Sequence, residues 1–160
     1  MQNIQRISPF LWFDHQAEDA ANFYVSIFKN SKVNKITYYG EAGPGPKGSV
    51  MTVSFELDGQ GFVALNGGTQ SKFTESISFM VNCNTQQEVD EYWEKLSTGG
   101  GKEIQCGWLK DKYGISWQVT PIVLMEMIGD PDPIKSQRVM EAMFQMKKID
   151  IKRLEQAYIQ

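Results

Sequence analysis

The chain has few of the side chains from which metal sites and nucleophile sites are usually built. Its 160 residues include one histidine, His15, and two cysteines, Cys83 and Cys106. The cysteines lack Cys-x-x-Cys spacing, and no histidine is placed beside either of them to activate a thiol. We therefore expect His15 to be a solvated loop residue and Cys106 to be a small apolar core residue. We predict no metal site and no cofactor.

Long apolar runs and an excess of basic residues are also missing. No stretch approaches the ~20 apolar residues of a membrane span, and Met1–Ser8 lacks the apolar segment of a signal peptide. The net charge of −3 argues against nucleic acid, because phosphate binding needs a clustered positive surface. We expect a cytoplasmic protein with neither a membrane nor a nucleic-acid partner.

A nucleotide-binding glycine motif is absent as well. No Gly-x-Gly-x-x-Gly sequence stands between a predicted strand and a predicted helix, which argues against a nucleotide or methyl-donor cofactor. The glycine-rich stretch Gly40–Gly48 precedes a predicted strand, whereas a phosphate-binding loop precedes a helix. Pro44 and Pro46 also remove amide donors from it. We predict a hairpin loop there.

What the chain does contain is an internal duplication. The first copy has a strand, a helix, a strand and a hairpin, at residues 7–14, 18–30, 33–39 and around 58–61. The second copy repeats this order at residues 76–82, 85–97, 102–110 and around 111–114. Asp14 is a plausible N-cap of the first helix, and Thr85 with Glu88 forms a capping-box pattern at the start of the second. A repeat of this length is too long for a solenoid, so it favours two modules that share one sheet.

The end of the chain is predicted to be helical. Asp132 can cap a helix whose first residue is Pro133, and an apolar seam of Val139, Met143 and Met146 follows. Asp150 can cap a short final helix that ends near Tyr158. We predict one domain at residues 1–129, with modules at about 1–70 and 71–122, and a helical tail at 130–160. The seam predicts a homodimer braced by the tail; alternatively, it folds back on its own sheet.

Strand alternation predicts a cleft on one side of the sheets. Turns at Asp58–Gly61 and Asp111–Gly114 set registers that place Phe55 and Trp108 beneath the helices. A register slip of one residue would instead place Cys106 and Trp108 in the cleft. The predicted small-molecule cleft is lined by Leu11, Phe13, Ser54, Glu56, Leu65, Ser78, Met80 and Gln118. The alternative is a sheet face covered by the tail or by a second subunit.

Glu56 is the one carboxylate predicted in this cleft. A buried Glu56 would serve as a general base, although the sequence offers no acid partner for it. The alternative is a strand-end charge close to solvent.

Four segments of the chain resemble a known family. They are residues 9–28, 64–68, 106–121 and 142–150. The chain is similar to the PhnB-like branch of the vicinal oxygen chelate (glyoxalase/bleomycin-resistance/dioxygenase) superfamily, often labelled 3-demethylubiquinone-9 3-methyltransferase-like. The resemblance implies an α+β fold in which two βαβββ modules form a curved mixed sheet around a cleft, commonly in a dimer.

Superfamily enzymes usually hold a divalent metal with His, Gln or Glu. The resemblance puts Ile7, Leu65, Ser76 and Gln118 at those positions, and only Gln118 has a side chain that coordinates metals. We therefore expect a metal-free protein that binds an unknown small molecule. The alternatives are a superfamily enzyme (lyase, isomerase, dioxygenase or transferase) with an unplaced metal or with Glu56 as base, and a structural dimer without a ligand.

Overall fold

The structure is a computed structural model that describes residues 4–160. The chain forms two compact units, unit 1 up to Phe73 and unit 2 from Thr74 onward. The helical tail, residues 130–160, belongs to unit 2. The expectation about Met1–Ser8 falls partly on residues 1–3, which lie outside the described residues.

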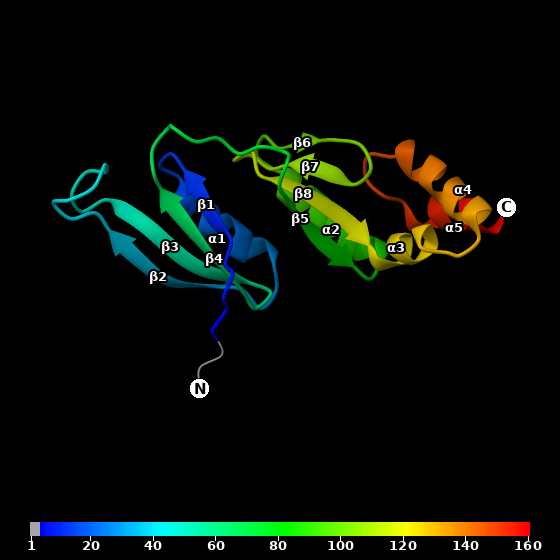
Figure 1. Ribbon diagram of the computed structural model, residues 1–160, viewed down its shortest axis with the longest axis horizontal. Coiled ribbons are helices and arrows are strands. Elements are labelled where there is room, and N and C mark those ends of the chain that lie inside the picture. Colours follow the sequence, from blue (N-terminus) through cyan, green and yellow to red (C-terminus); the bar gives the residue numbers. More distant parts are fainter. Residues whose placement is uncertain (1–3) are drawn as a thin grey trace. The chain divides into compact units, whose positions relative to one another are not determined.

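Unit 1 is a βαβββ module. Its sheet has the strand order β1-β4-β3-β2, with β1 parallel to β4 and the other neighbours antiparallel (Figure 1). The elements are β1 (Phe10–Phe13), α1 (Ala17–Ile27), β2 (Lys32–Tyr38), β3 (Val50–Leu57) and β4 (Gln60–Asn66).

Unit 2 repeats the same topology. Its sheet has the order β5-β8-β7-β6, again with the first pair parallel. The elements are β5 (Ser78–Cys83), α2 (Gln86–Ser97), β6 (Lys102–Glu103), β7 (Trp108–Lys110) and β8 (Ser116–Pro121). The duplication is therefore confirmed, and the hydrogen bonds form one four-stranded sheet in each module.

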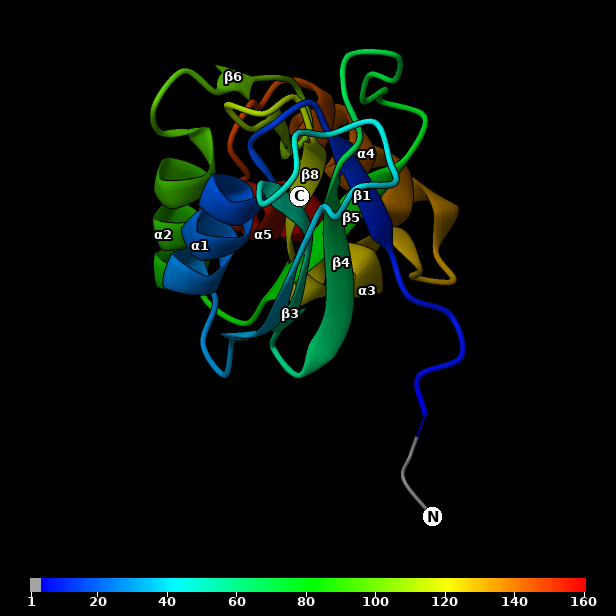
Figure 2. The ribbon, with the colours of Figure 1, turned by 90° about the vertical axis from the view of Figure 1, so that its left-hand side faces the viewer.

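Helix α1 covers one face of the unit 1 sheet, as Figure 2 shows from the side of unit 1. It buries an alanine-rich stripe and Tyr24, whose ring stacks on Phe55 at 6.4 Å between centroids. The predicted N-cap, Asp14, is wrong, because the helix starts after Gln16. The free N–H of Ala17 instead donates to the Asn66 side chain at 2.8 Å, so the end of β4 caps α1.

Helix α2 begins with the predicted capping box. The Thr85 hydroxyl accepts a hydrogen bond from the Glu88 N–H at 3.2 Å, and the Glu88 carboxylate accepts one from the Asn84 N–H at 2.6 Å. The helix then buries Val89, Trp93 and Leu96.

The turn of the β3–β4 hairpin lies one residue earlier than the sequence pattern indicated. Leu57 pairs with Gln60, and Asp58 and Gly59 form the turn with φ values of 47° and 78°. Both values suit a two-residue hairpin turn. The register therefore differs from the predicted one by an even number of residues, and the assignment of β3 and β4 side chains to the two faces is kept.

The β7–β8 hairpin is longer by one residue, which changes the face of β7. Asp111 accepts hydrogen bonds from the N–H groups of Tyr113 and Ile115, and its own N–H donates to the Ile115 carbonyl. Lys110 consequently pairs with Ser116. The prediction that Trp108 lies beneath α2 is wrong, because Leu109, which is fully buried, occupies that side.

The predicted strand at residues 102–110 is in fact two short antiparallel strands, β6 and β7. Between them Cys106 adopts φ 61° and is half-buried, so its predicted place in the core is wrong. Its N–H and that of Gly107 donate to the carbonyls of Met146 and Lys147, which ties the tail to the start of β7.

Three helices, α3 (Ile122–Ile128), α4 (Pro133–Phe144) and α5 (Ile151–Ile159), end the chain. Asp132 and Asp150 cap α4 and α5 through backbone N–H groups, as predicted. Unit 2 packs the apolar seam into its own core: Val139 and Met146 are buried, and Met143 is partly buried against the same cluster. Its core cluster consists of Leu124, Met127, Val139, Met146, Ile149 and Leu154. No helix within residues 4–160 is long and apolar enough to cross a membrane.

Candidate functional site

One face of the unit 2 sheet is turned away from α2 and carries most of the polar side chains of its strands. We call it the polar face of unit 2. The ladders β5–β8, β8–β7 and β7–β6 place successive pairs side by side on it, so neighbouring strands contribute to one surface. Its members are Ser78, Met80, Asn82, Lys102, Trp108, Lys110, Ser116, Gln118 and Thr120.

The predicted cleft residues of this unit therefore do share a face. Ser78 and Met80 of β5 pair with Ser116 and Gln118 of β8. The Gln118 Nε2 donates to the Ser78 hydroxyl at 2.9 Å, which orients the amide and leaves its oxygen directed away from that bond. Met80 is 43% exposed and adds an apolar, adaptable contact.

Ser116 is the unexplained residue at the centre of this face. It is only 1% exposed, and its hydroxyl has no hydrogen-bond partner within residues 4–160. A buried hydroxyl without a partner costs about 1–3 kcal/mol, and native proteins contain few of them.

The main predicted register left Trp108 and Lys110 off the polar face, because it assumed a turn one residue too short; the alternative register, shifted by one residue, had placed Trp108 in the cleft. Trp108 pairs with Gln118, and both are half-buried. The Lys110 ammonium donates to the Glu75 carboxylate at 3.0 Å, and this bond lowers the pKa of Glu75. The sequence signal for the longer turn is Asp111, because aspartate side chains often order turns by accepting hydrogen bonds from backbone N–H groups.

In unit 1, three of the predicted cleft residues share the sheet face opposite α1: Ser54, Glu56 and Leu65. Two do not. Leu11 and Phe13 are 8% and 3% exposed and lie on the face that α1 covers, because Leu11 pairs with Ala64 in the parallel β1–β4 ladder. Phe10 and Trp12 take the opposite face. The side chains of β1 alternate between the two faces of the sheet, as predicted. However, only the pairing of β1 with β4 determines which of the two sets faces α1.

Glu56 stands in a surface ion pair. Its carboxylate accepts a hydrogen bond from the Asn34 amide at 3.0 Å and lies 3.9 Å from the Lys32 ammonium. The side chain is 32% exposed. This arrangement is that of a solvated strand-end charge, as the alternative interpretation held, and not of a buried general base.

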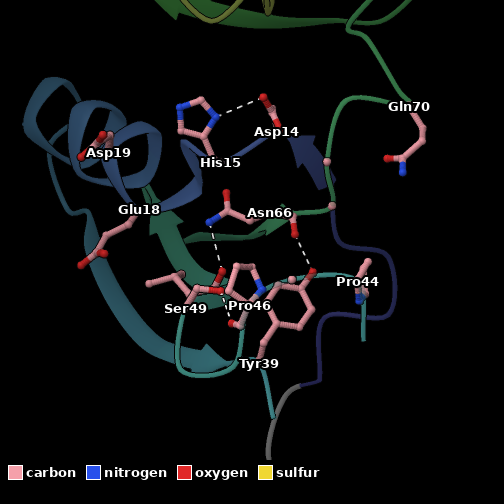
Figure 3. A pocket seen from close by; sticks show the side chains of 14 residues that line it. Asp14, His15, Glu18, Asp19, Tyr39, Pro44, Pro46, Ser49, Asn66 and Gln70 are labelled. Carbon is pink, nitrogen blue, oxygen red and sulfur yellow. Dashed lines mark hydrogen bonds and ion pairs between the residues drawn. The ribbon is translucent and has the colours of Figure 1, made fainter. Parts of the chain in front are cut away.

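Unit 1 also contains a hollow of about 540 Å³ beside the N-terminus of α1 (Figure 3). His15 and Asp14, with 3.1 Å between Nδ1 and Oδ2, lie along one wall, and Tyr39 and Pro46 lie along the other. The residues 40–48 form the hairpin loop between β2 and β3, as predicted. The walls come from three segments that are distant in sequence, so no local pattern indicated this hollow.

Hydrogen bonds hold the hollow together around Asn66, the residue that caps α1. Its amide nitrogen donates to the Val50 carbonyl at 3.1 Å, and the Tyr39 hydroxyl donates to its carbonyl at 2.5 Å. Glu18 and Asp19 add acidic side chains at the mouth. Both lie in the first turn of α1, where the helix dipole favours negative charge. The helix explains these acids without a ligand, and His15 is 77% exposed, as expected of a solvated loop residue.

The positions at which the superfamily holds a metal do not fit a cation in this chain. Ile7 precedes β1 and is 88% exposed, Leu65 is apolar, and Ser76 precedes β5. Gln118 is bonded to Ser78, and one neutral amide does not hold a catalytic cation. Within residues 4–160, no three His, Cys, Asp or Glu side chains gather closely enough to bind a metal ion.

The family model described as 3-demethylubiquinone-9 3-methyltransferase matches residues 5–120. The chain belongs to this family. The matched region spans both βαβββ modules and stops within β8, so α3, α4 and α5 lie beyond it. The tail segment 142–150, which also suggested the family, is therefore not covered by the match. No curated protein is significantly similar to the chain.

Solved structures support the family and its fold. A putative 3-demethylubiquinone-9 3-methyltransferase, the PhnB protein from Bacillus cereus, is 38% identical with a TM-score of 0.67, over 73% of this chain and 99% of that one. A protein from Pseudomonas aeruginosa is 18% identical with a TM-score of 0.59, over 72% and 96% of the two chains. The fosfomycin resistance protein FosX from Listeria monocytogenes is 16% identical with a TM-score of 0.51, over 75% and 94%.

This PhnB-like family member therefore has the α+β glyoxalase/bleomycin-resistance fold built from two modules. The similarity to FosX lies below the identity at which function transfers, so it shows the fold alone. The methyltransferase name describes the family. In this chain the Gly-x-Gly-x-x-Gly spacing at residues 43–48 lies in the loop between β2 and β3, whereas a nucleotide-type cofactor site has it at the start of a helix.

Proposed function

We propose that this protein binds a small organic molecule on the polar face of unit 2 and does so without a metal. The buried Ser116 hydroxyl carries the proposal, since it has no partner within the described residues. A ligand group that bonds to it would remove a cost of about 1–3 kcal/mol. The ordered Ser78–Gln118 pair beside it would fix the orientation of such a ligand.

The Ser116→Ala variant separates a binding hydroxyl from a structural one. Without ligand, the variant should be as stable as the natural protein or up to about 1 kcal/mol more stable, because an unsatisfied buried group is removed. The variant should also bind the ligand more weakly than the natural protein does. A structural hydroxyl would give the opposite result, a less stable protein with unchanged binding.

A thermal-shift screen of metabolites supplies the ligand for this test. A compound at 100 times its dissociation constant should stabilise the natural protein by about 2.7 kcal/mol, and Ser116→Ala and Gln118→Leu should reduce the shift. Ser54→Ala, on the unit 1 sheet, is the matched control and should leave the shift unchanged. If no compound in a broad set shifts the melting temperature, the proposed function is wrong.

The rival function is an enzyme of the superfamily type, with Glu56 as base or with a metal. The ion pair of Glu56 with Lys32 weighs against the first version. Elemental analysis of protein purified without chelators tests the second: one equivalent of nickel, zinc, iron or manganese per chain would overturn the metal-free proposal.

We also keep a homodimer and a cytoplasmic location as proposals. Apolar side chains such as Ile122, Met125 and Phe144 are 41%, 51% and 58% exposed and offer a surface for a second copy. Cys83 and Cys106 are free thiols, which suits a reducing compartment. Light scattering should report twice the 18.2 kDa mass of one chain, and a monomer at micromolar concentration would refute the dimer.

A further inference from the structure

A hollow of about 630 Å³ lies on unit 2 where β6 and β7 meet the start of the α4–α5 connection. Its lining includes three lysines, Lys102, Lys110 and Lys147, together with Trp108. Two of these lysines and the tryptophan belong to the polar face, so the hollow is the edge of that face. We call it the lysine hollow.

The charges in the lysine hollow are not balanced by its own acids. Glu75 pairs with Lys110 at 3.0 Å. Glu103 accepts a hydrogen bond from the Trp93 indole at 2.8 Å and lies opposite Leu109 in the ladder, on the side that α2 covers. Within residues 4–160, Lys102 and Lys147 have no acidic partner. Because three lysines and two acids, Glu75 and Glu103, line the lysine hollow, it carries a net charge of +1.

The sheet places two of the lysines directly against each other. Lys102 pairs with Lys110 across the β6–β7 ladder, and like charges in this position are destabilising. A lysine on the edge strand β6 is a common defence against sheet extension. That defence accounts for Lys102, but it does not require a lysine at position 110 on the inner strand or at position 147 on another segment. An anion between the three ammonium groups would remove the repulsion.

Trp108 gives the lysine hollow a flat apolar wall. It is two residues before Lys110 on β7 and therefore on the same face, and it is half-buried. The indole of tryptophan presents a broad surface at low conformational cost, and it packs well against planar groups. A wall of this kind next to ammonium groups suits a molecule with an apolar body and a negatively charged end.

We infer that the polar face of unit 2 binds an organic anion with a planar apolar body, whose charged group lies between Lys102, Lys110 and Lys147 and whose body lies against Trp108. The inference rests on the proposed function, because it names the chemical class of the ligand at that same face. Ser116 lies beside Lys110 and Ser78 in the ladders and would bond to a polar group of the same molecule.

Three probes test the two parts of the ligand separately by isothermal titration calorimetry on the full chain. 2-Naphthoate has the planar body and the charge, 2-naphthylmethanol has the body alone, and inorganic phosphate has the charge alone. We expect 2-naphthoate to bind tightest of the three. Raising the salt from 50 to 500 mM should weaken 2-naphthoate and leave 2-naphthylmethanol unchanged, because salt screens only the charged contact.

Charge-neutralising variants locate the site. Lys102→Gln and Lys110→Gln should each weaken the binding of 2-naphthoate by up to roughly fivefold, the upper end of the range for exposed ion pairs. Lys152→Gln removes the same charge from an exposed position on α5 and should have no effect. Trp108→Leu should weaken 2-naphthoate and 2-naphthylmethanol alike. Lys102→Gln should also leave the melting temperature of the free protein unchanged or raised, since it removes the repulsion with Lys110.

The outcomes distinguish this inference from the proposed function. Equal affinity for 2-naphthoate and 2-naphthylmethanol, or equal loss in the Lys152 variant, would refute the anionic ligand. Phosphate binding as tight as that of 2-naphthoate, with no effect of Trp108→Leu, would refute the planar body. If a metabolite depends on Ser116 but is indifferent to the lysines, the inference fails and the proposed function stands. If no probe and no metabolite binds, both fail.

Discussion

The carboxylate of Asp111 should be among the most important side chains for the stability of unit 2. It is 3% exposed and accepts hydrogen bonds from the N–H groups of Tyr113 at 2.9 Å and Ile115 at 3.1 Å, and from the indole of Trp117 at 2.9 Å. Ile115 and Trp117 are each only 4% exposed, so water does not replace the lost acceptor at these two donors.

Removing this acceptor should cost more than an ordinary surface mutation. Asp111→Ala leaves two buried donors without a partner, at about 1–3 kcal/mol each, so we expect a loss of about 2–6 kcal/mol in the free energy of unfolding. Asp111→Asn keeps an oxygen for the backbone donors but turns an amide nitrogen toward the Trp117 indole. We expect it to cost about 1–3 kcal/mol, because two donors then face each other.

Urea unfolding followed by circular dichroism measures these losses. Asp58→Asn is the matched control, since Asp58 is an exposed turn residue with φ 47°, a conformation that asparagine tolerates; its change should stay within about 0.5 kcal/mol. Adding Trp117→Phe to Asp111→Asn should recover part of the loss, because the orphaned donor is gone. If Asp111→Asn is as stable as the control Asp58→Asn, the argument that Asp111 orders this turn is wrong.

Three further predictions concern the thiols, a glycine and the tail. Burial raises the pKa of the Cys83 thiol to about 12. Iodoacetamide at pH 8 should therefore alkylate half-buried Cys106 in the folded protein and reach Cys83 only after unfolding. Equal alkylation rates of the two cysteines by mass spectrometry would contradict this. Gly107→Ala should lower the free energy of unfolding by about 2 kcal/mol or more, because φ is +81° and the new methyl group would lie 2.9 Å from a β8 carbonyl oxygen. Gly114→Ala, with φ +92° and open space around it, should cost only about 1 kcal/mol. Thermal melts of both variants measure the difference. A protein ending at Gly129 should aggregate or melt at a lower temperature, because the buried side of α3 loses its cover of α4 and α5; unchanged solubility and melting in the shortened chain would show that the tail is dispensable.

Local chemistry determined the parts of the fold that the sequence predicted well. The capping box at Thr85, the caps Asp132 and Asp150, and the repeated order of strand and helix depend on residues a few positions apart. Each signal is a short-range contact between a side chain and its own backbone, and no distant partner alters it. The family resemblance in residues 9–28 and 106–121 agrees with the family match over residues 5–120.

Contacts between distant residues decided the rest. The face of Trp108 depended on a single extra turn residue, which the bonds of Asp111 fix, and the face of Leu11 depended on parallel pairing with β4. Because side chains alternate at every residue, a shift of one position exchanges a whole strand between core and surface. Likewise, the sequence indicated an apolar stripe in the tail, but only the tertiary structure showed that Val139 is buried against α3 of the same chain.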